Sequence, residues 1–237
     1  VAIIGAGLIG CEFTNDLLNG GFTVEAVDPM GWCLPTLLPE QSGRAVQAAL
    51  EEKGATFHFG PLATEVNRVG EGYAVTLNNG DTIEADAVLC AVGVRPRTTL
   101  ASDAGIEVNR GIVTDRKLRT NAPNVYAMGD CAEVAGHVLV YVAPLMAAAR
   151  ALAATLAGET TDVSYPAMPV AIKTPACPVV VSPPAKDADG EWHFEGDAPD
   201  IKALFRSGAG ELLGFALTGQ AVKERMALAK ELPAILG

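Results

Sequence analysis

Six residues near the start of the chain have the types and spacing of a phosphate-binding turn: Gly5-Ala6-Gly7-Leu8-Ile9-Gly10. In such a turn Gly5 permits the tight bend, Gly7 lets the backbone approach a ligand, and Gly10 lets the following helix pack closely on the strand. The free backbone N–H groups of Leu8 and Ile9 would then face the charge of a pyrophosphate. The pattern predicts a dinucleotide site.

The strand and helix predicted on either side of this turn are those of a dinucleotide-binding unit. Apolar residues 1–5 predict a buried strand, and a helix is expected from Leu8 to Asn19. At the end of the next strand, Asp28 lies 18 residues after Gly10, where a carboxylate can accept hydrogen bonds from ribose hydroxyls. A carboxylate repels a 2′-phosphate, and residues 29–34 contain no Lys or Arg, so NADH is predicted rather than NADPH.

A second candidate site lies at Gly129 and Asp130, after a strand predicted over Asn124–Ala127. The glycine permits close approach of a ligand, and the Asp130 carboxylate offers acceptor oxygens to hydroxyl groups. By residue type alone, the same segment is also consistent with an ordinary turn after a strand.

Composition excludes several classes of partner. The formal net charge of −11 argues against nucleic acid and against an anionic membrane surface. No apolar run reaches the roughly 18 to 20 residues of a membrane-spanning helix, and no secretory signal precedes the glycine turn. The five cysteines form no close pair and the three histidines are dispersed, so no metal site is predicted and each cysteine is expected to be a small buried side chain. These features predict a cytoplasmic protein.

The order of elements predicts an α/β protein with a Rossmann-like βαβαβ start. Strands are expected at 22–27, 55–59, 63–69, 73–77, 81–85, 87–92, 112–113, 169–173, 178–182, 191–195, 201–206 and 211–218, and further helices at 39–53, 144–156 and 221–232. Three domains are predicted, at residues 1–97, 98–165 and 166–237. Because the chain opens inside a strand, we expect it to be the C-terminal part of a longer polypeptide.

Together these motifs resemble the FAD- and NAD-dependent pyridine-nucleotide oxidoreductases. The segment Thr120–Asp130 is similar to the family's second flavin motif, in which the Asp holds the ribityl chain of FAD. The stretch Ala91-Val92-Gly93-Val94-Arg95-Pro96 is similar to the end of the family's inserted NAD domain. Lys173-Thr174-Pro175-Ala176-Cys177-Pro178 is the most distinctive segment of the likeness, which spans essentially the whole chain. The family's N-terminal FAD segment has no counterpart here.

The resemblance implies that FAD is contacted or supported by four residues: Glu12, Asp130, Val142 and Lys173. Val142 is expected in a loop just before the helix that starts near Pro144. Lys173 stands in an otherwise apolar strand, and a buried ammonium needs a counter-charge. We therefore expect an ion pair between Lys173 and Glu12.

The likeness is greatest to the members that reduce rubredoxin. It implies electron transfer from NADH through FAD to rubredoxin or a similar small iron–sulfur carrier, in a chain of reactions such as alkane hydroxylation. A ferredoxin or flavorubredoxin reductase is the alternative among enzymes, since a dithiol reductase is expected to carry a His-Glu setting that His193 lacks. A nucleotide-binding module without turnover is the alternative of another class. An acidic carrier would need a local basic patch, and the densest is Arg110, Arg116, Lys117 and Arg119.

Overall fold

The computed structural model describes residues 1–237, which divide into two compact units. The first unit consists of Val1–Gly93 and Pro169–Leu232, and the second of Val94–Met168 and Pro233–Gly237. The first and third predicted domains thus fall largely within one unit, because they share a hydrophobic core. The division into three domains at 97 and 165 stays a prediction.

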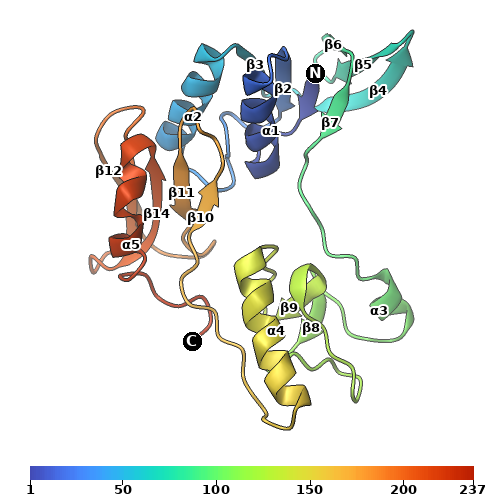
Figure 1. The fold of residues 1–237 in the computed structure, drawn as a ribbon, viewed down its shortest axis with the longest axis vertical. Helices are drawn as coiled ribbons and strands as arrows, with labels where there is room; N and C mark the ends of the chain where they lie inside the picture. The colour runs from blue at the N-terminus through green and yellow to red at the C-terminus, as the bar shows by residue number, and fades with distance from the viewer. The chain divides into compact units, whose positions relative to one another are not determined.

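The first unit contains a four-stranded parallel sheet in the order β3-β2-β1-β7 (Figure 1). Its strands are β1 (Ala2–Ile4), β2 (Val24–Asp28), β3 (Ala55–Phe59) and β7 (Val88–Cys90). The crossover helices are α1 (Leu8–Asn19) and α2 (Glu40–Glu52). The predicted βαβαβ start is confirmed. The strand predicted over 87–92 is present as β7, but it is shorter and is an edge strand whose Cys90 is exposed, so the sequence pattern of a buried strand does not hold there.

Local chemistry sets the ends of α1 and α2. Helix α1 ends at Gly20, and Gly21 follows with a φ of +82°, a backbone conformation that glycine adopts without strain. Helix α2 begins after Pro39, whose backbone is extended, and Glu40 pairs with Arg44 one turn later at 2.8 Å. These signals explain why both helices lie where the sequence predicts them.

A small antiparallel sheet is inserted between β3 and β7. Its strands are β4 (Ala63–Val69), β5 (Gly72–Leu77) and β6 (Thr82–Ala85). The turn into β6 has Gly80 at a φ of +93°, and Asn79 accepts a hydrogen bond from the Asp81 N–H at 3.1 Å. The three strands predicted at 63–69, 73–77 and 81–85 are confirmed.

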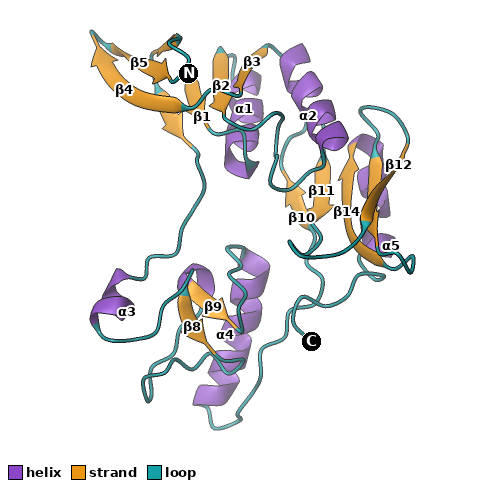
Figure 2. Ribbon diagram, turned by 180° about the vertical axis from the view of Figure 1, so that it is seen from behind, coloured by secondary structure: helices purple, strands orange, loops and turns teal.

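The C-terminal part of the first unit is a five-stranded antiparallel sheet in the order β10-β11-β14-β13-β12 (Figure 2). Its strands are β10 (Val170–Ile172), β11 (Val179–Ser182), β12 (Glu191–Glu195), β13 (Lys202–Arg206) and β14 (Leu212–Thr218). All five were predicted within two residues. One face packs on α2, through Val46 and Leu50 of the helix and Ile172, Val181 and Ala216 of the sheet.

The other face of this sheet is covered by a 3₁₀ helix, η2 (Gly219–Glu224), and a short α-helix, α5 (Arg225–Leu228). A single helix over 221–232 was predicted, and that expectation is wrong. The Asp200 carboxylate accepts a hydrogen bond from the Gln220 N–H at 2.7 Å, which fixes the start of the tighter helix. Pro233 disfavours a helical conformation at Leu232, the last residue of the predicted helix.

The second unit contains α3 (Thr99–Asp103), β8 (Ile112–Thr114), η1 (Gly129–Cys131), β9 (Ala132–Val134) and α4 (Val142–Leu156). Strands β8 and β9 form a parallel pair. The strand expected over Asn124–Ala127 is wrong, because only an isolated bridge between Arg119 and Tyr126 forms there and Asn124 has a φ of +62°. Helix α4 begins two residues before Pro144. None of the helices combines the length and apolar character that crossing a membrane requires.

Candidate functional site

The glycine turn joins β1 to α1, and two of its glycines are required by the fold itself. Gly5 has a φ of +106°, and a Cβ atom there would lie 2.5 Å from the Ala91 carbonyl oxygen. A Cβ atom on Gly10 would overlap the carbonyl oxygen of Gly5. These two positions explain how the first turn of α1 comes so close to the sheet.

Gly7 is different, because the protein alone does not require glycine there. Its φ is −76°, which any residue adopts, and a Cβ atom would have no neighbour within 4 Å. The helix that starts next to it has no side-chain cap and no acidic residue in its first turn, so its N–H groups stay available. The open space beside Gly7 and these N–H groups fit the close approach of a pyrophosphate.

Asp28 braces the glycine turn from the end of β2. Its side chain is buried, with 8% exposure. One carboxylate oxygen accepts a hydrogen bond from the Ala6 N–H at 2.7 Å, and the other accepts one from the Met30 N–H at 2.8 Å. Sequence reasoning missed this bracing role; the predicted contact with a ribose stays a prediction.

The thiols of Cys11 and Cys33 are part of the hydrophobic core next to the glycine turn. Cys11 donates a hydrogen bond to the Ala6 carbonyl at 3.2 Å, and both Cys11 and Cys33 are fully buried. Burial raises the pKa of the Cys33 thiol, and the neighbouring Cys11 raises it further. A raised pKa keeps the Cys33 thiol protonated, as expected of a small buried side chain. That expectation is wrong for Cys90, which is exposed, and for Cys131, which is only half-buried.

The Glu12 carboxylate contacts Lys173, but not through the ion pair that was predicted. Glu12 accepts a hydrogen bond from the backbone N–H of Lys173 at 2.7 Å. The Lys173 side chain is exposed just after β10 and has no carboxylate within 4 Å, so the premise of a buried ammonium is wrong. The residue after β10 therefore contacts α1 through its backbone N–H group and not through the Lys173 ammonium.

A second contact of the same kind was not predicted. Asn15, one turn after Glu12, is fully buried and accepts a hydrogen bond from the Ala176 N–H at 3.0 Å. The segment that it holds is itself a tight turn, in which the Thr174 hydroxyl donates to the Cys177 carbonyl at 2.7 Å. Helix α1 is therefore fixed to residues 173–178 by two bonds, each between residues 161 positions apart in the sequence.

Gly93, at the end of the first segment of the first unit, has a φ of +100° that favours glycine.

In the second unit, Gly129 and Asp130 form the start of η1. Gly129 has a φ of +77°, and a Cβ atom there would lie 3.0 Å from the Leu145 side chain. The Asp130 carboxylate is exposed and makes no hydrogen bond, so its oxygens are available to a ligand. Val142 is the first residue of α4 rather than part of a loop, with 74% exposure at a helix start that has no side-chain cap.

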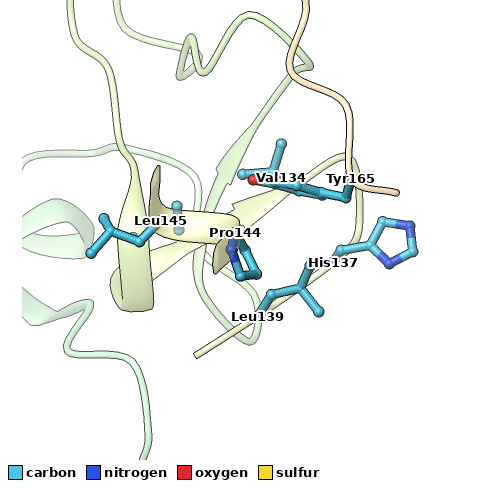
Figure 3. A pocket seen from close by; sticks show the side chains of 8 residues that line it. Val134, His137, Leu139, Pro144, Leu145 and Tyr165 are labelled. Carbon is cyan, nitrogen blue, oxygen red and sulfur yellow. The ribbon is translucent and has the colours of Figure 1, made fainter. Parts of the chain in front are cut away.

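A small hollow lies at the start of α4, and Figure 3 shows side chains that line it. It is lined by Gly129, Ala132, Val134, His137, Leu139, Pro144, Leu145 and Tyr165. The His137 ring points away from Pro144 in this view, and burial raises the pKa of the Tyr165 hydroxyl. The cavity volume of the hollow is about 10 Å³, far below the ~300–1,000 Å³ typical of ligand sites, so it belongs to the packing under the turn.

Glu133, on β9, is a buried carboxylate that sequence reasoning missed. It accepts hydrogen bonds from the Asn109 side chain at 3.1 Å and from the backbone N–H groups of Arg110 and Gly111 at 2.9 and 3.1 Å. Since Glu133 follows Asp130 by three residues, these bonds tie the second candidate site to the turn before β8.

The basic cluster near residue 116 is largely occupied by contacts within the second unit. Arg119 pairs with Asp115 at 2.7 Å, and Lys117 lies 3.3 Å from Asp162. Burial tends to raise the pKa of Asp115, but hydrogen bonds from the Arg119 side chain and backbone and the Lys117 backbone outweigh it and lower that pKa. The guanidinium of Arg116 donates to the Val163 carbonyl at 3.3 Å. Two of the four cations of the cluster, Lys117 and Arg119, are therefore paired with carboxylates.

Comparison with known proteins assigns the class. Residues 1–155 match the family model described as pyridine nucleotide-disulphide oxidoreductase, and residues 162–232 match the one described as rubredoxin binding C-terminal domain. The chain belongs to the pyridine nucleotide-disulphide oxidoreductase family, which confirms the resemblance found in the sequence.

The chain is also similar to individual proteins within this family. The chain is 62% identical, over its whole length, to a rubredoxin-NAD(+) reductase of Alcanivorax borkumensis, and 38% identical over 98% of its length to a nitric oxide reductase FlRd-NAD(+) reductase of Aliivibrio fischeri. It spans 62% and 61% of the lengths of these two relatives. A crystal structure of a ferredoxin reductase from Rhodopseudomonas palustris has the same fold, with a TM-score of 0.85 at 24% identity over 98% of this chain and 60% of that one.

Proposed function

We propose that this chain carries the NADH site and the carrier-binding domain of a FAD-dependent enzyme that transfers electrons from NADH to rubredoxin. The proposal rests on the surroundings of Gly7. Its backbone conformation does not require glycine, a Cβ atom there would have no neighbour within 4 Å, and it precedes a helix without a side-chain cap. The named relatives and the match of residues 162–232 to a rubredoxin binding domain support the choice of carrier.

Two sets of residues are proposed to hold the cofactors. NADH is assigned to the turn and its neighbours: Gly5, Gly7, Leu8, Ile9, Gly10, Asp28 and Gly93. FAD is assigned to Glu12 and Lys173 of the first unit and to Gly129, Asp130 and Val142 of the second. The free Asp130 carboxylate and the open helix start at Val142 fit hydroxyl groups and a negatively charged ring, respectively. Bound FAD supplies the conversion between the two-electron donor and a one-electron carrier.

The chain's own residues act by binding and orientation. The first N–H groups of α1 neutralise the pyrophosphate, and the Asp28 brace keeps the turn in the conformation that exposes them. Buried Asp28 also places negative charge near the ribose, which disfavours a 2′-phosphate and supports NADH over NADPH. Since this reaction draws on NADH, we propose the cytoplasm as its location.

The test of the NADH site is the pair Gly7→Ala and Gly31→Ala in the full-length polypeptide loaded with FAD. Neither glycine has a left-handed backbone, and a Cβ atom on either meets nothing within 4 Å, so both variants should keep the thermal stability of the parent. Gly7→Ala should raise the Kd for NADH about tenfold or more, a cost of ~1.4 kcal/mol, and Gly31→Ala should leave it unchanged. An unchanged Kd in both variants would remove the assignment of the turn.

A flavorubredoxin reductase is the second candidate, because a relative of that name is 38% identical to this chain. The two candidates differ in carrier only. Comparison of kcat/KM for rubredoxin and for a flavorubredoxin distinguishes these two candidates. If the full-length polypeptide binds no flavin and shows no turnover, a nucleotide-binding module is favoured instead of an enzyme.

A further inference from the structure

Both backbone groups of Ala6, inside the glycine turn, are held by the protein itself. The Ala6 N–H donates to the Asp28 carboxylate at 2.7 Å. The Ala6 carbonyl accepts two hydrogen bonds, one from the Leu34 N–H at 2.8 Å and one from the Cys11 thiol at 3.2 Å. Ala6, Cys11 and Leu34 are all buried in the same hydrophobic core. Neither backbone group of Ala6 is therefore free to bind a ligand.

The next donor along the chain is the Gly7 N–H, and the Ala6 carbonyl fixes its direction. The peptide bond between these two residues is trans. In a trans peptide, the carbonyl of one residue and the N–H of the next point in opposite directions. Because the Ala6 carbonyl points into the core, the Gly7 N–H points out of it. This N–H donates no hydrogen bond within the protein, and the space beside Gly7 is open.

Leu34 contacts Ala6 from an unfavourable backbone conformation. Its φ is +60°, in the left-handed region that residues with a Cβ atom rarely adopt. Its side chain is fully buried, and its carbonyl accepts hydrogen bonds from the Leu37 and Leu38 N–H groups, both at 2.9 Å. Such a conformation persists only where the surrounding structure imposes it. The Leu34 N–H is therefore a fixed donor to the Ala6 carbonyl.

Cys11 supplies the second donor from the first turn of α1. Side chains on a helix lean toward its N-terminus, so the Cys11 sulfur reaches back to the carbonyl five residues earlier. Hydrogen bonds that a carbonyl accepts polarise its peptide group, which makes the N–H of that group a stronger donor. Since Cys11 is fully buried, it can act on a ligand only through the Ala6–Gly7 peptide group.

We propose that Cys11 is a positioning residue for the pyrophosphate of the dinucleotide. Together with Leu34 it holds the Ala6 carbonyl against the core, and the Gly7 N–H is thereby directed at the phosphate oxygens. The proposal rests on the proposed function, which assigns the pyrophosphate to this turn. The sequence alone predicts only a small buried side chain at position 11.

The experiment compares Cys11→Ala with Cys11→Ser in the full-length polypeptide loaded with FAD. The Ser hydroxyl keeps a donor to the Ala6 carbonyl, and Ala removes it. The ligands are ADP-ribose, which contains the pyrophosphate, and adenosine, which does not. Calorimetric titration should show that Cys11→Ala raises the Kd for ADP-ribose about threefold, as expected for the loss of one hydrogen bond, and leaves the Kd for adenosine unchanged. Cys11→Ser should bind ADP-ribose like the parent.

The matched control is Cys177→Ala, which removes a buried thiol from the same core but no hydrogen bond to Ala6, and should leave both Kd values unchanged. An unchanged Kd for ADP-ribose in Cys11→Ala, or an equal increase for both ligands, would overturn the proposal. Equal weakening of ADP-ribose binding by Cys11→Ser or by Cys177→Ala would also overturn it, because the effect would then be one of core packing.

If Cys11→Ala fails to fold, Cys11→Val takes its place, since valine fills more of the space and has no donor. A parent protein that does not bind ADP-ribose would instead overturn the proposed function, and the role of Cys11 with it.

Discussion

One oxygen of the Asp28 carboxylate lies 2.7 Å from the backbone nitrogen of Ala6, and so joins the end of β2 to the turn between β1 and α1. The other oxygen holds the Met30 N–H at 2.8 Å. The residue that sequence patterns assign to the ribose is thus also a structural support of the phosphate-binding turn. A change at Asp28 should therefore alter both the stability of the protein and its affinity for nucleotide.

Asp28→Asn separates the two roles. The amide keeps one acceptor oxygen but places an NH₂ group against a backbone N–H, which should lower the free energy of unfolding by ~1–3 kcal/mol. If the carboxylate also contacts the ribose, the ratio of the Kd values for NADPH and NADH should fall. Denaturant unfolding and fluorescence titration with both nucleotides measure these effects. Equal weakening of both nucleotides would leave Asp28 as a brace only.

Asn15→Leu should weaken NADH binding from a position that does not touch the nucleotide. It leaves the Ala176 N–H unsatisfied in a buried position, which should cost ~1–3 kcal/mol of stability. Loss of this contact should loosen α1 and raise the Kd for NADH severalfold. Asn15→Asp, which keeps the acceptor oxygen, should bind NADH more tightly than Asn15→Leu. If Asn15→Leu binds NADH like the parent at a temperature where it is folded, the contact stabilises the fold without positioning the turn.

Glu133→Ala and Glu133→Gln test the buried carboxylate near Asp130. The Ala variant leaves three N–H donors without an acceptor, so unfolding should become easier by ~3 kcal/mol or more. The Gln variant keeps one acceptor oxygen and should lose less. In the full-length flavoprotein, FAD should dissociate faster from the Ala variant, as followed by flavin fluorescence. Equal FAD retention in both variants and the parent would show that Glu133 does not position Asp130.

The pair formed by Asp115 and Arg119 should make stability depend on pH at the acidic end. Because the pKa of Asp115 is lowered in the folded state, its contribution is present above the ordinary Asp pKa of ~3.9 and is lost as the pH falls through the folded value. Asp115→Asn should therefore destabilise the protein at pH 7, and the loss should shrink as the pH falls below the ordinary Asp pKa, as measured by denaturant unfolding at a series of pH values. A loss that does not change with pH would contradict an electrostatic origin.

Reversal of charge at Arg116 and Lys117 tests whether the basic cluster predicted from the sequence is the docking surface for the electron carrier. Lys117 pairs with Asp162 and Arg116 donates to the Val163 carbonyl, so these cations are engaged within the second unit. The double change to Glu should leave kcat/KM for rubredoxin within about twofold of the parent at moderate salt. A decrease of tenfold or more, with ferricyanide reduction unchanged, would restore this cluster as the docking surface.

Local patterns predicted most of the fold, and their failures have local causes. The small antiparallel sheet of β4, β5 and β6 and the C-terminal strands were predictable because alternating side chains are separated by turn residues such as Asn79 and Gly80. The strand predicted at Asn124–Ala127 fails because Asn124 adopts a positive φ, and the true partner of β8 begins only at Ala132.

The candidate site was predicted in part. The glycines were identified because their spacing is itself the signal. The contacts of Glu12 and Asn15 join backbone groups 161 residues away, and no periodicity in the sequence reports such a pairing. The expected ion pair fails because the turn presents its N–H groups to α1 and its Lys173 side chain to solvent.

Stopped-flow mixing tests the central claim most directly. The full-length flavoprotein is reduced with NADH and then mixed with oxidised rubredoxin or with oxidised ferredoxin, while flavin and carrier absorbance are followed together. We expect rapid reduction by NADH, much slower reduction by NADPH, and electron transfer to rubredoxin at least tenfold faster than to ferredoxin. Absence of flavin reduction by NADH, or transfer to ferredoxin faster than to rubredoxin, would contradict the account.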